Sequence, residues 1–293
     1  MKRKKKKSGG AVLGAVLLAV LVIALLLGGS ALMKKINAYG DRVVSAGPEK
    51  KNEGLHIVET TSPVAENMSR IDPACFSEED GFLRYDDGTV KSRLGIDVSA
   101  YQGLIDWERV RADGIEFAVL RIGFRGYSEG KIQKDAYFEQ NYENARAAGL
   151  DVGVYFFSQA ISVDEAVEEA DFVLSELNGR ELQLPVFFDW ESIEDEARSD
   201  IMNPIGLTGC AFSFCAAVEK GNYDAGVYFN QAVGYQSLNL QSLEDYTFWL
   251  AEYNETPSFL YRFELWQYSA EGRVDGINGN VDLDLRFSDP EYP

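Results

Sequence analysis

The segment Leu184-Pro-Val-Phe-Phe-Asp-Trp-Glu191 predicts a buried β-strand that ends in two carboxylates. Valine and phenylalanine favour strands, and proline suits the first residue of one. Side chains alternate along a strand, so Asp189 and Glu191 are expected on the same side. Each of two such carboxylates raises the pKa of the other, which is the coupling that an acid/base pair needs. The alternative is a strand that runs into an acidic loop, because three acids follow at 194–196.

Further strands and helices alternate on both sides of this segment, which predicts a parallel sheet with right-handed crossovers. Eight strands suggest closure into a TIM-like α/β barrel. The last three strands have only short connections, so the barrel is expected to be irregular. The predicted strands are Gly95–Val98, Phe117–Ile122, Val152–Phe157, Pro185–Asp189, Gly226–Phe229, Thr247–Tyr253, Phe263–Tyr268 and Asn280–Leu283. The predicted helices are Trp107–Ala112, Ala136–Ala148, Val163–Leu177 and about 205–220.

The N-terminal residues have the pattern of a membrane anchor. Residues 2–7 are all basic, and the 19 residues 11–29 carry no charge. We therefore expect a cytoplasmic segment at 1–10, a single transmembrane helix at 11–33 in contact with the lipid bilayer, and the rest of the chain outside the cell. A cleaved signal peptide is the alternative. The apolar run exceeds the ~7–15 residues of a signal sequence, which favours an uncleaved anchor.

The remaining domain boundaries follow from composition. Residues 34–80 are polar without sustained periodicity and are expected to form an extracellular spacer. Residues 81–92 are expected to form a hairpin that leads into the domain, with Asp87-Gly88 at its turn. The barrel is then expected to occupy residues 93–289.

Charge and rare residue types exclude several functions. The chain has a net charge of −19. Residues 1–51 contain 11 basic and two acidic residues. The remainder has 17 basic and 45 acidic residues, and therefore a net charge of −28. Such a body should not bind nucleic acid through its phosphates. The single histidine, His56, argues against a His-dependent nucleophile or a His-ligated zinc site. Three cysteines give no disulfide framework, and no cofactor is expected.

Polar residues gather at the predicted strand ends, where barrel enzymes have their active sites. Acids from three distant segments could converge there, with aromatic rings around them. Carboxylates serve proton transfer and an oxocarbenium-like charge, and rings stack on sugars, so this combination favours a sugar-cleaving site. The predicted acids are Asp97, Asp189, Glu191 and Asp282, and the accompanying residues are Tyr155, Tyr228, Tyr253, Gln267 and Arg121.

Each of these residues also has a structural alternative. An isolated aspartate often caps a turn, and we assign Asp284 that role. Strand tyrosines commonly pack in a core, and Arg121 could form an ordinary ion pair. A carboxylate cluster could also hold a divalent metal, although no metal site is expected here because no histidine lies near.

Eight ordered blocks of this sequence resemble the glycoside hydrolase family 25 lysozymes over about residues 93–288. The first is Gly95-Ile-Asp-Val-Ser-Ala-Tyr-Gln-Gly-Leu-Ile-Asp-Trp107. The resemblance implies a flattened (β/α)5β3 barrel, and hydrolysis of the β-1,4 bond between N-acetylmuramic acid and N-acetylglucosamine in peptidoglycan. The later blocks are Phe117–Gly123, Ala148–Phe157, Leu184–Glu191, Gly226–Tyr228, Trp249–Tyr253, Leu265–Tyr268 and Gly279–Leu283.

The resemblance also implies residue roles. Glu191 matches the general acid, and Asp189, Asp97 and Asp282 match the other active-site carboxylates. Asp189 would either attack C1 or orient the N-acetyl group of the substrate. The expected protein is a monomeric, membrane-tethered lysozyme on a Gram-positive-type envelope. The alternatives are an inactive glycan-binding module, a metal-dependent esterase or deacetylase, and a hydrolase of another aminosugar polymer such as chitin.

Overall fold

The computed structural model describes residues 69–193 and 196–288. The chain divides into two units, residues 1–53 and 54–293, and every described residue belongs to the second. The predicted cytoplasmic segment at 1–10, the anchor at 11–33 and most of the spacer at 34–80 lie outside the described residues. Within the described ranges, no helix is both long enough and apolar enough to cross a bilayer.

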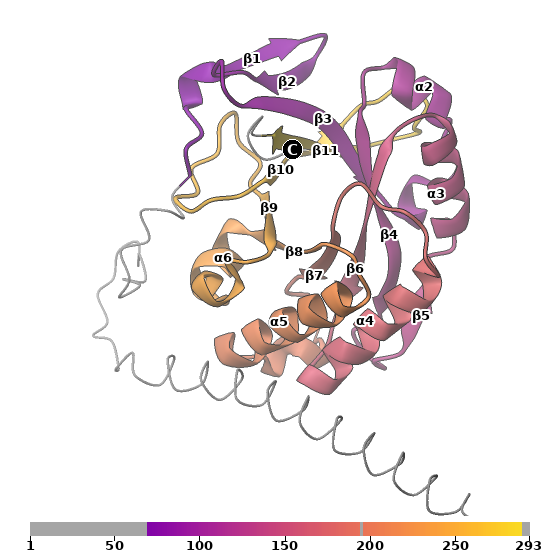
Figure 1. Cartoon of the computed structure of the whole chain (residues 1–293), viewed down its shortest axis with the longest axis vertical. Helices are drawn as coiled ribbons and strands as arrows, with labels where there is room; N and C mark the ends of the chain where they lie inside the picture. Colours follow the sequence, from indigo (N-terminus) through magenta and orange to yellow (C-terminus); the bar gives the residue numbers. More distant parts are fainter. Residues whose placement is uncertain (1–68, 194–195, 289–293) are drawn as a thin grey trace, which may run out of the picture. The chain divides into compact units, whose positions relative to one another are not determined.

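Eight strands close into a barrel, as the alternation of strands and helices predicted (Figure 1). The strand order is β3-β11-β10-β9-β8-β7-β6-β4, and pairing of β3 with β4 closes the ring. A short additional strand, β5 (Ile132–Lys134), extends the sheet beyond β4. The barrel strands are β3 (Lys91–Val98), β4 (Phe117–Arg125), β6 (Asp151–Ser158), β7 (Val186–Trp190), β8 (Ala225–Asn230), β9 (Thr247–Ala251), β10 (Leu265–Gly272) and β11 (Val281–Ser288).

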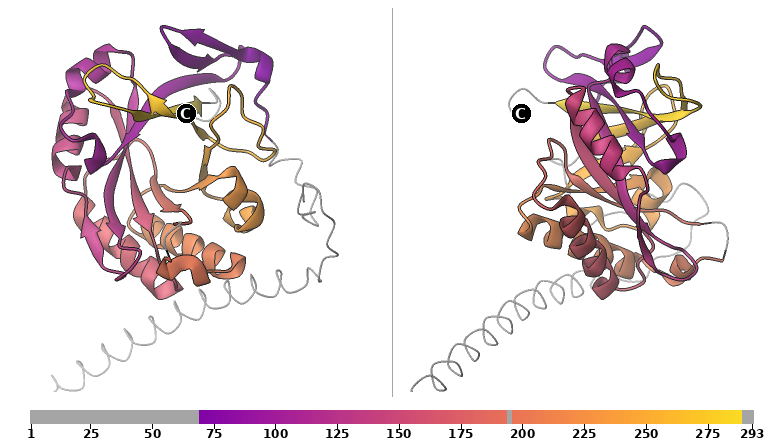
Figure 2. Two further views of the ribbon diagram at one scale, coloured as in Figure 1. Left: turned by 180° about the vertical axis from the view of Figure 1, so that it is seen from behind. Right: turned by 90° about the vertical axis from the view of Figure 1, so that its right-hand side faces the viewer.

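Five helices connect the first six barrel strands, and the last three strands follow one another without an α-helix, so the described barrel has the (β/α)5β3 order. Helix α4 begins after Ser162, whose side chain caps the helix by accepting a hydrogen bond from the Glu165 N–H (3.3 Å). Helices α3, α4 and α5 lie outside the ring of strands in both views of Figure 2. The helices are α2 (Trp107–Ala112), α3 (Phe138–Ala147), α4 (Val163–Leu177), α5 (Pro204–Lys220) and the unpredicted α6 (Gln231–Gln236).

The last strand runs in the opposite direction to its neighbours. β11 pairs antiparallel with both β10 and β3, whereas the other barrel pairings are parallel. The sequence analysis placed Asp282 near the C-terminal end of a strand, but it is the second residue of β11. Because β11 is reversed, its beginning lies at the same barrel end as the ends of the parallel strands. Asp282 is therefore directly opposite Asp97 of β3.

Alternation along the strands divides the core into two layers. Ile96, Leu120 and Phe188 point outward and pack beneath the helices, in a large buried cluster. Phe117 and Phe187 belong to a smaller cluster inside the ring. Gly95 makes room for this cluster, because a Cβ atom there would lie 2.2 Å from the Phe117 ring. The interior rings fill the barrel below the carboxylates, which leaves the polar site at one end.

The N-terminal boundary of the domain differs from the prediction. Residues 69–80, expected in the spacer, form ordered structure against the barrel. β1 (Phe76–Glu79) and β2 (Phe82–Tyr85) make an antiparallel hairpin that turns at 80–81. The predicted turn at 87–88 is present, but only one bridge, between Asp86 and Lys91, spans it. The physical reason is that the rings of β1 and β2 bury against barrel residues, which the local turn pattern does not reveal.

Candidate active site

A pocket of about 280 Å³ opens at the end of the barrel where the parallel strands finish. All nine predicted site residues line it: Asp97, Arg121, Tyr155, Asp189, Glu191, Tyr228, Tyr253, Gln267 and Asp282. They come from eight different strands or the residues directly after them. Tyr101, Gln102, Phe157 and Trp249 also line the pocket and were not predicted.

Strand alternation explains how the carboxylates reach this pocket. Asp189 follows Phe187 on the inner face of β7 and is 5% exposed. Glu191 lies one residue beyond the end of β7 and is only half-buried. Asp97, near the end of β3, is 6% exposed. The pocket therefore has two buried carboxylates, Asp97 and Asp189, and two half-buried carboxyl groups, Glu191 and Asp282, that are more accessible to solvent.

A chain of hydrogen bonds links the polar residues of the pocket. The hydroxyl groups of Tyr228 and Tyr253 both donate to Gln267 Oε1, at 3.0 and 2.8 Å. Gln267 Nε2 in turn donates to Asp97 Oδ2 at 2.7 Å. Gln267 is 4% exposed, so this amide is held inside the barrel. It fixes two aromatic rings and one carboxylate in a single arrangement.

Burial dominates the electrostatics of the four acids. Burial raises the pKa of Asp97 well above its usual range, and the nearby charges of Asp284 and Asp282 raise it further. Burial also raises the pKa of Asp189 well above its usual range, and the charge of Glu191 adds to that shift. Burial also raises the pKa of Asp282 to about 6, with a further contribution from Glu191. For Glu191, burial raises the pKa and hydrogen bonding with Tyr228 partly opposes it. The site therefore holds protons at pH values where exposed carboxylates have lost them.

Arg121 has a structural partner as well as a place in the pocket. Its Nε donates to Asp135 Oδ2 at 2.8 Å, and Asp135 is 2% exposed. The guanidinium carbon lies 5.1 Å from the ring centre of Tyr101. Tyr101 is 87% exposed, which makes it a flat apolar surface at the mouth of the pocket. Its position within the first family-like block was the signal that could have identified it.

Asp284 is not the turn cap that the sequence analysis assigned. It lies within β11, is completely buried, and accepts a hydrogen bond from Trp249 Nε1 at 2.8 Å. Its Oδ2 has no hydrogen-bond partner among the described residues. Because Asp282 and Asp284 are two apart on one strand, alternation could have placed both on the inner face.

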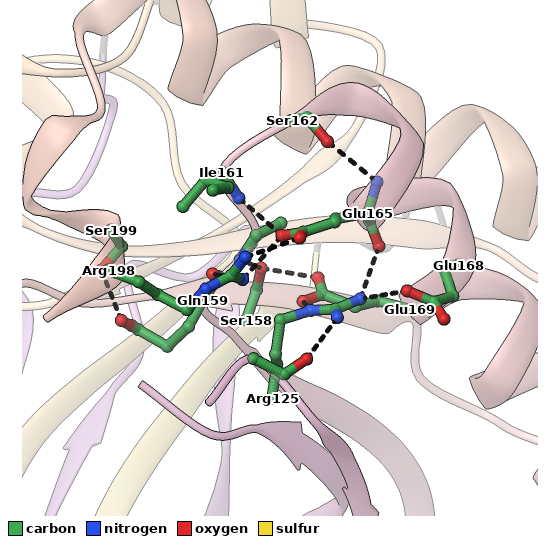
Figure 3. Close-up of polar contacts among 12 residues, drawn as sticks. Arg125, Ser158, Gln159, Ile161, Ser162, Glu165, Glu168, Glu169, Arg198 and Ser199 are labelled. Carbon is green, nitrogen blue, oxygen red and sulfur yellow. Dashed lines mark hydrogen bonds and ion pairs between the residues drawn. The ribbon is translucent and has the colours of Figure 1, made fainter. Parts of the chain in front are cut away.

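A second polar cluster surrounds Gln159 and Arg125 (Figure 3), and Gln159 connects it to the backbone of Glu191. Gln159, fully buried after the end of β6, donates from Nε2 to the Glu191 carbonyl oxygen at 3.1 Å. Its Oε1 accepts a hydrogen bond from the Ser199 hydroxyl. Arg198 donates to the Gln159 carbonyl oxygen at 3.1 Å. Gln159 thus ties together two points of the chain on either side of residues 194–195.

Ion pairs stabilise this second cluster. Arg125 Nε lies 2.6 Å from Glu169 Oε1, and both side chains are almost fully buried. Arg198 donates to both carboxylate oxygens of Glu165, at 2.7 and 2.6 Å. The Ser158 hydroxyl donates to Glu169 Oε2 at 2.6 Å, as Figure 3 shows. We call Arg125, Glu165, Glu168, Glu169 and Arg198 the rear ion-pair cluster.

Four carboxyl groups with raised pKa values, beside aromatic rings, can transfer protons and stabilise a developing positive charge on a sugar ring. Within the described ranges, no three His, Cys, Asp or Glu side chains come together in a way that could hold a metal ion. The arrangement suits acid-assisted cleavage of a glycosidic bond.

Comparison with known proteins agrees with this chemistry. Residues 96–277 match the model of glycosyl hydrolases family 25. Lysozyme M1 of Streptomyces globisporus is 30% identical over 201 residues, which cover 64% of this chain and 65% of the relative. The uncharacterized protein YegX of Escherichia coli K12 is 30% identical over 199 residues, which cover 65% of this chain and 68% of YegX.

Solved structures give the same picture. A bacterial lysozyme from Streptomyces coelicolor is 28% identical with a TM-score of 0.55, covering 68% of this chain and 92% of that one. The autolysin LytC from Streptococcus pneumoniae is 18% identical with a TM-score of 0.62, which shows that the folds are alike. The match covers 73% of this chain and 52% of LytC. With its barrel, its carboxylate pocket and a family match over most of its length, the chain belongs to glycosyl hydrolases family 25 and is a glycoside hydrolase.

Proposed function

We propose that this glycoside hydrolase is a lysozyme that cleaves the β-1,4 bond between N-acetylmuramic acid and N-acetylglucosamine in peptidoglycan. Lysozymes among its relatives support this substrate. The observation that carries the proposal is the convergence of Asp97, Asp189, Glu191 and Asp282 in one pocket with aromatic walls.

Glu191 is the proposed general acid. It is the most accessible of the pair at the end of β7, and burial raises its pKa, so a proton remains available for the leaving oxygen. The single hydroxyl proton of Tyr228 goes to Gln267. Tyr228 can donate to an ionised Glu191 only by releasing Gln267. This competition limits stabilisation of the ionised form and favours the protonated acid.

Two roles are open to Asp189, which lies two residues earlier and deeper in the pocket. It either attacks C1 to form a glycosyl-enzyme or orients the N-acetyl group of the substrate as an internal nucleophile. A fluorinated sugar that traps a covalent adduct on Asp189 would assign the first role. Inhibition by a thiazoline analogue of the cyclised N-acetyl group would assign the second.

Aromatic and amide side chains form the proposed sugar-binding walls. Tyr155, Tyr228 and Tyr253 surround the carboxylates, and Gln267 fixes two of these rings. Exposed Tyr101, with Arg121 against its ring, offers a stacking surface at the entrance. These groups can stack on sugar faces and form hydrogen bonds with sugar hydroxyl groups. Apart from Arg121, none of them carries a positive charge.

The decisive experiment is mass spectrometry of fragments that the full-length chain releases from purified cell walls. Fragments with muramic acid at the reducing end support the proposal. Reducing-end N-acetylglucosamine would contradict the muramidase assignment, and cleavage of chitin alone would indicate another aminosugar polymer. Absence of any release by the parent chain would favour a binding module.

We further propose that residues 11–33 anchor the enzyme in the cell membrane, with the barrel on the extracellular side of that membrane in a Gram-positive-type envelope. The basic run at 2–7 before the uncharged segment supports this orientation. Protease added to intact protoplasts should then digest the barrel while an epitope at the N-terminus survives. A barrel that is protected until the cells are lysed would contradict the orientation.

A further inference from the structure

The hairpin β1–β2 is a docked part of the domain that precedes the matched segment 96–277. The Phe76 ring packs edge-on against Trp266 of β10, with ring centres 5.4 Å apart. Tyr85 contacts both Phe76 and Phe287, at 5.0 and 5.4 Å. The Tyr85 hydroxyl also donates to Asp87 Oδ2 at 2.9 Å. These contacts hold the hairpin as a fixed wall beside β10.

A groove of about 1070 Å³ lies between this wall and the residues that follow β9 and end β10. Ser77 and Glu78 line it from the hairpin, Asn254 from the opposite loop, and Ala270 from β10. Tyr253 lines both this groove and the catalytic pocket. A polymer that leaves the pocket past Tyr253 therefore enters the groove.

The size of the pocket requires such an extension. Its volume of about 280 Å³ is at the small end of the ~300–1,000 Å³ of small-molecule sites. The proposed substrate is a polymer, so most of a bound strand must lie outside the pocket. The groove is larger than the pocket and directly adjoins it.

Charge distinguishes between the two parts of peptidoglycan that could occupy the groove. Glu78, Glu255 and Glu271 line it, and none of its described lining residues is Lys, Arg or His. Stem peptides carry free carboxylates, which this surface would repel. The glycan backbone of peptidoglycan is uncharged where the lactyl carboxyl groups of N-acetylmuramic acid are in amide linkage. Its hydroxyl groups can donate to carboxylates, and its sugar faces can stack on Tyr253.

We propose that this hairpin groove binds the glycan strand as it continues from the catalytic pocket, which makes the enzyme selective for long strands. The inference rests on the proposed lysozyme function. It adds a binding surface built by residues 76–85, outside the segment that matches the family.

Steric filling of the groove tests the proposal. Ala270 is exposed in the groove wall, so Ala270→Trp should block the groove while the barrel stays folded. Ser77→Trp should do the same from the hairpin side. Ala112→Trp is the matched control, because Ala112 is exposed at the end of α2 and does not line the groove. Thermal unfolding of each variant verifies folding.

The readout is kcat/KM on long glycan strands freed of stem peptides, with their lactyl carboxyl groups amidated, and on the equally amidated tetrasaccharide of two disaccharide repeats. Long strands that keep their peptides are the third substrate. Both groove variants should lose about tenfold on long strands, equivalent to about 1.4 kcal/mol, and less than twofold on the tetrasaccharide. The control should match the parent on both substrates.

Three results would overturn the groove assignment: unchanged kcat/KM on long strands, equal losses on both substrates, or a loss only on strands that keep their peptides. The last would identify the stem peptide as the occupant. Binding of long strands to Glu191→Gln, with and without Ala270→Trp, tests the groove without turnover. If the parent cleaves neither substrate but the groove variant still weakens binding, the lysozyme function fails and the groove stands.

Discussion

Two clusters of acidic side chains lie on either side of the β7 strand end, and they differ in how their charges are compensated. In the rear ion-pair cluster, Glu169 pairs with Arg125 and Glu165 pairs with Arg198. Among the described residues that line the catalytic pocket, Arg121 is the only basic one, and its Nε donates to Asp135, outside the four catalytic candidates.

This difference separates buried acids that stabilise the fold from buried acids that are suited to acid catalysis. A buried acid with an arginine partner fixes neighbouring chain segments, and loss of either partner is costly. A buried acid without a cation keeps its proton to higher pH, which is a cost to stability but a requirement for acid catalysis. Acidic residues thus have opposite roles in the two clusters, on helix α4 in one and at the barrel end in the other.

Glu191→Gln is expected to have the largest effect. The substitution is nearly isosteric but removes the transferable proton, so hydrolysis of cell walls should fall by about 10²–10⁴-fold. Thermal unfolding should be unchanged or shifted upward, because an uncompensated acid is removed. Dye release from labelled cell walls measures the rate, and more than half of the parent rate would rule out Glu191 as the acid.

Arg125→Met should give the reverse result, a loss of stability. It leaves Glu169 buried without its cation, and at pH 8 the free energy of unfolding should fall by about 3–5 kcal/mol. Lys131→Met is the control, because the Lys131–Glu129 pair is exposed and should be worth less than about 1 kcal/mol. Equal losses in the two variants, measured by denaturant unfolding, would contradict the importance of buried pairing.

The pH dependence of stability limits this distinction, because Glu169 keeps a raised pKa although Arg125 pairs with it. Burial raises the pKa of Glu169 from its usual 4.5 to about 7, against opposing hydrogen bonds from Ser158 and Arg125. The folded chain therefore binds a proton that the unfolded chain releases, so stability is greatest below pH 4.5 and declines as pH rises through 7. For Glu169 the decline is roughly 3 kcal/mol. Denaturant unfolding between pH 5 and 8 measures it, and a Glu169→Gln variant with an equally steep profile would disprove this origin.

Gln159→Met tests the link between the two clusters. It removes the hydrogen bond to the Glu191 carbonyl but leaves the rear ion pairs in place. A small displacement of Glu191 should lower kcat roughly tenfold with little change in KM, because catalysis depends on sub-ångström placement. Ser199→Ala removes only the other hydrogen bond of Gln159 and should retain most of kcat. Proportional losses in both variants would point to a general packing role.

The smallest expected effect is that of salt on the pH profile. The raised pKa of Glu191 should place the activity optimum on the acidic side of neutrality, with activity lost as pH rises through that pKa. The net charge of −28 on the chain beyond residue 51 raises the pKa of Glu191 further, and salt screens this charge. Added salt should therefore move the alkaline limb of the pH profile to lower pH by a fraction of a unit.

An alkaline limb that does not move with ionic strength would contradict the long-range contribution of the net charge. Activity that depends on a divalent metal would refute the two-carboxylate mechanism.

Local patterns predicted the elements better than their directions. Helix α4 has the predicted bounds, Val163–Leu177, and all eight barrel strands overlap their predicted ranges. β3 begins at Lys91 and β11 ends at Ser288, so both are longer than predicted. The reversal of β11 was missed because strand direction depends on which partners it pairs with. The hairpin β1–β2 was missed because distant rings, such as Trp266, stabilise it.

The site residues that line the pocket could be predicted from the alternation of side chains along the strands. Residues that act by contacting these site residues could not be predicted. Asp97, Asp189 and Glu191 could be found because acids at strand ends are costly without a function. Gln159 carried no such signal, since its importance depends on a contact with the Glu191 backbone. Asp284 was misassigned by treating a single aspartate in isolation from Asp282.

The antiparallel pairing of β11 with β3 also sets the moment at which the enzyme can first act. Asp282 meets Asp97 only when the strand made last in this barrel inserts beside the strand made first. A nascent chain that ends before β11 lacks one of the four carboxylates and has an open ring. We therefore expect that bond cleavage begins only after the whole barrel has been made.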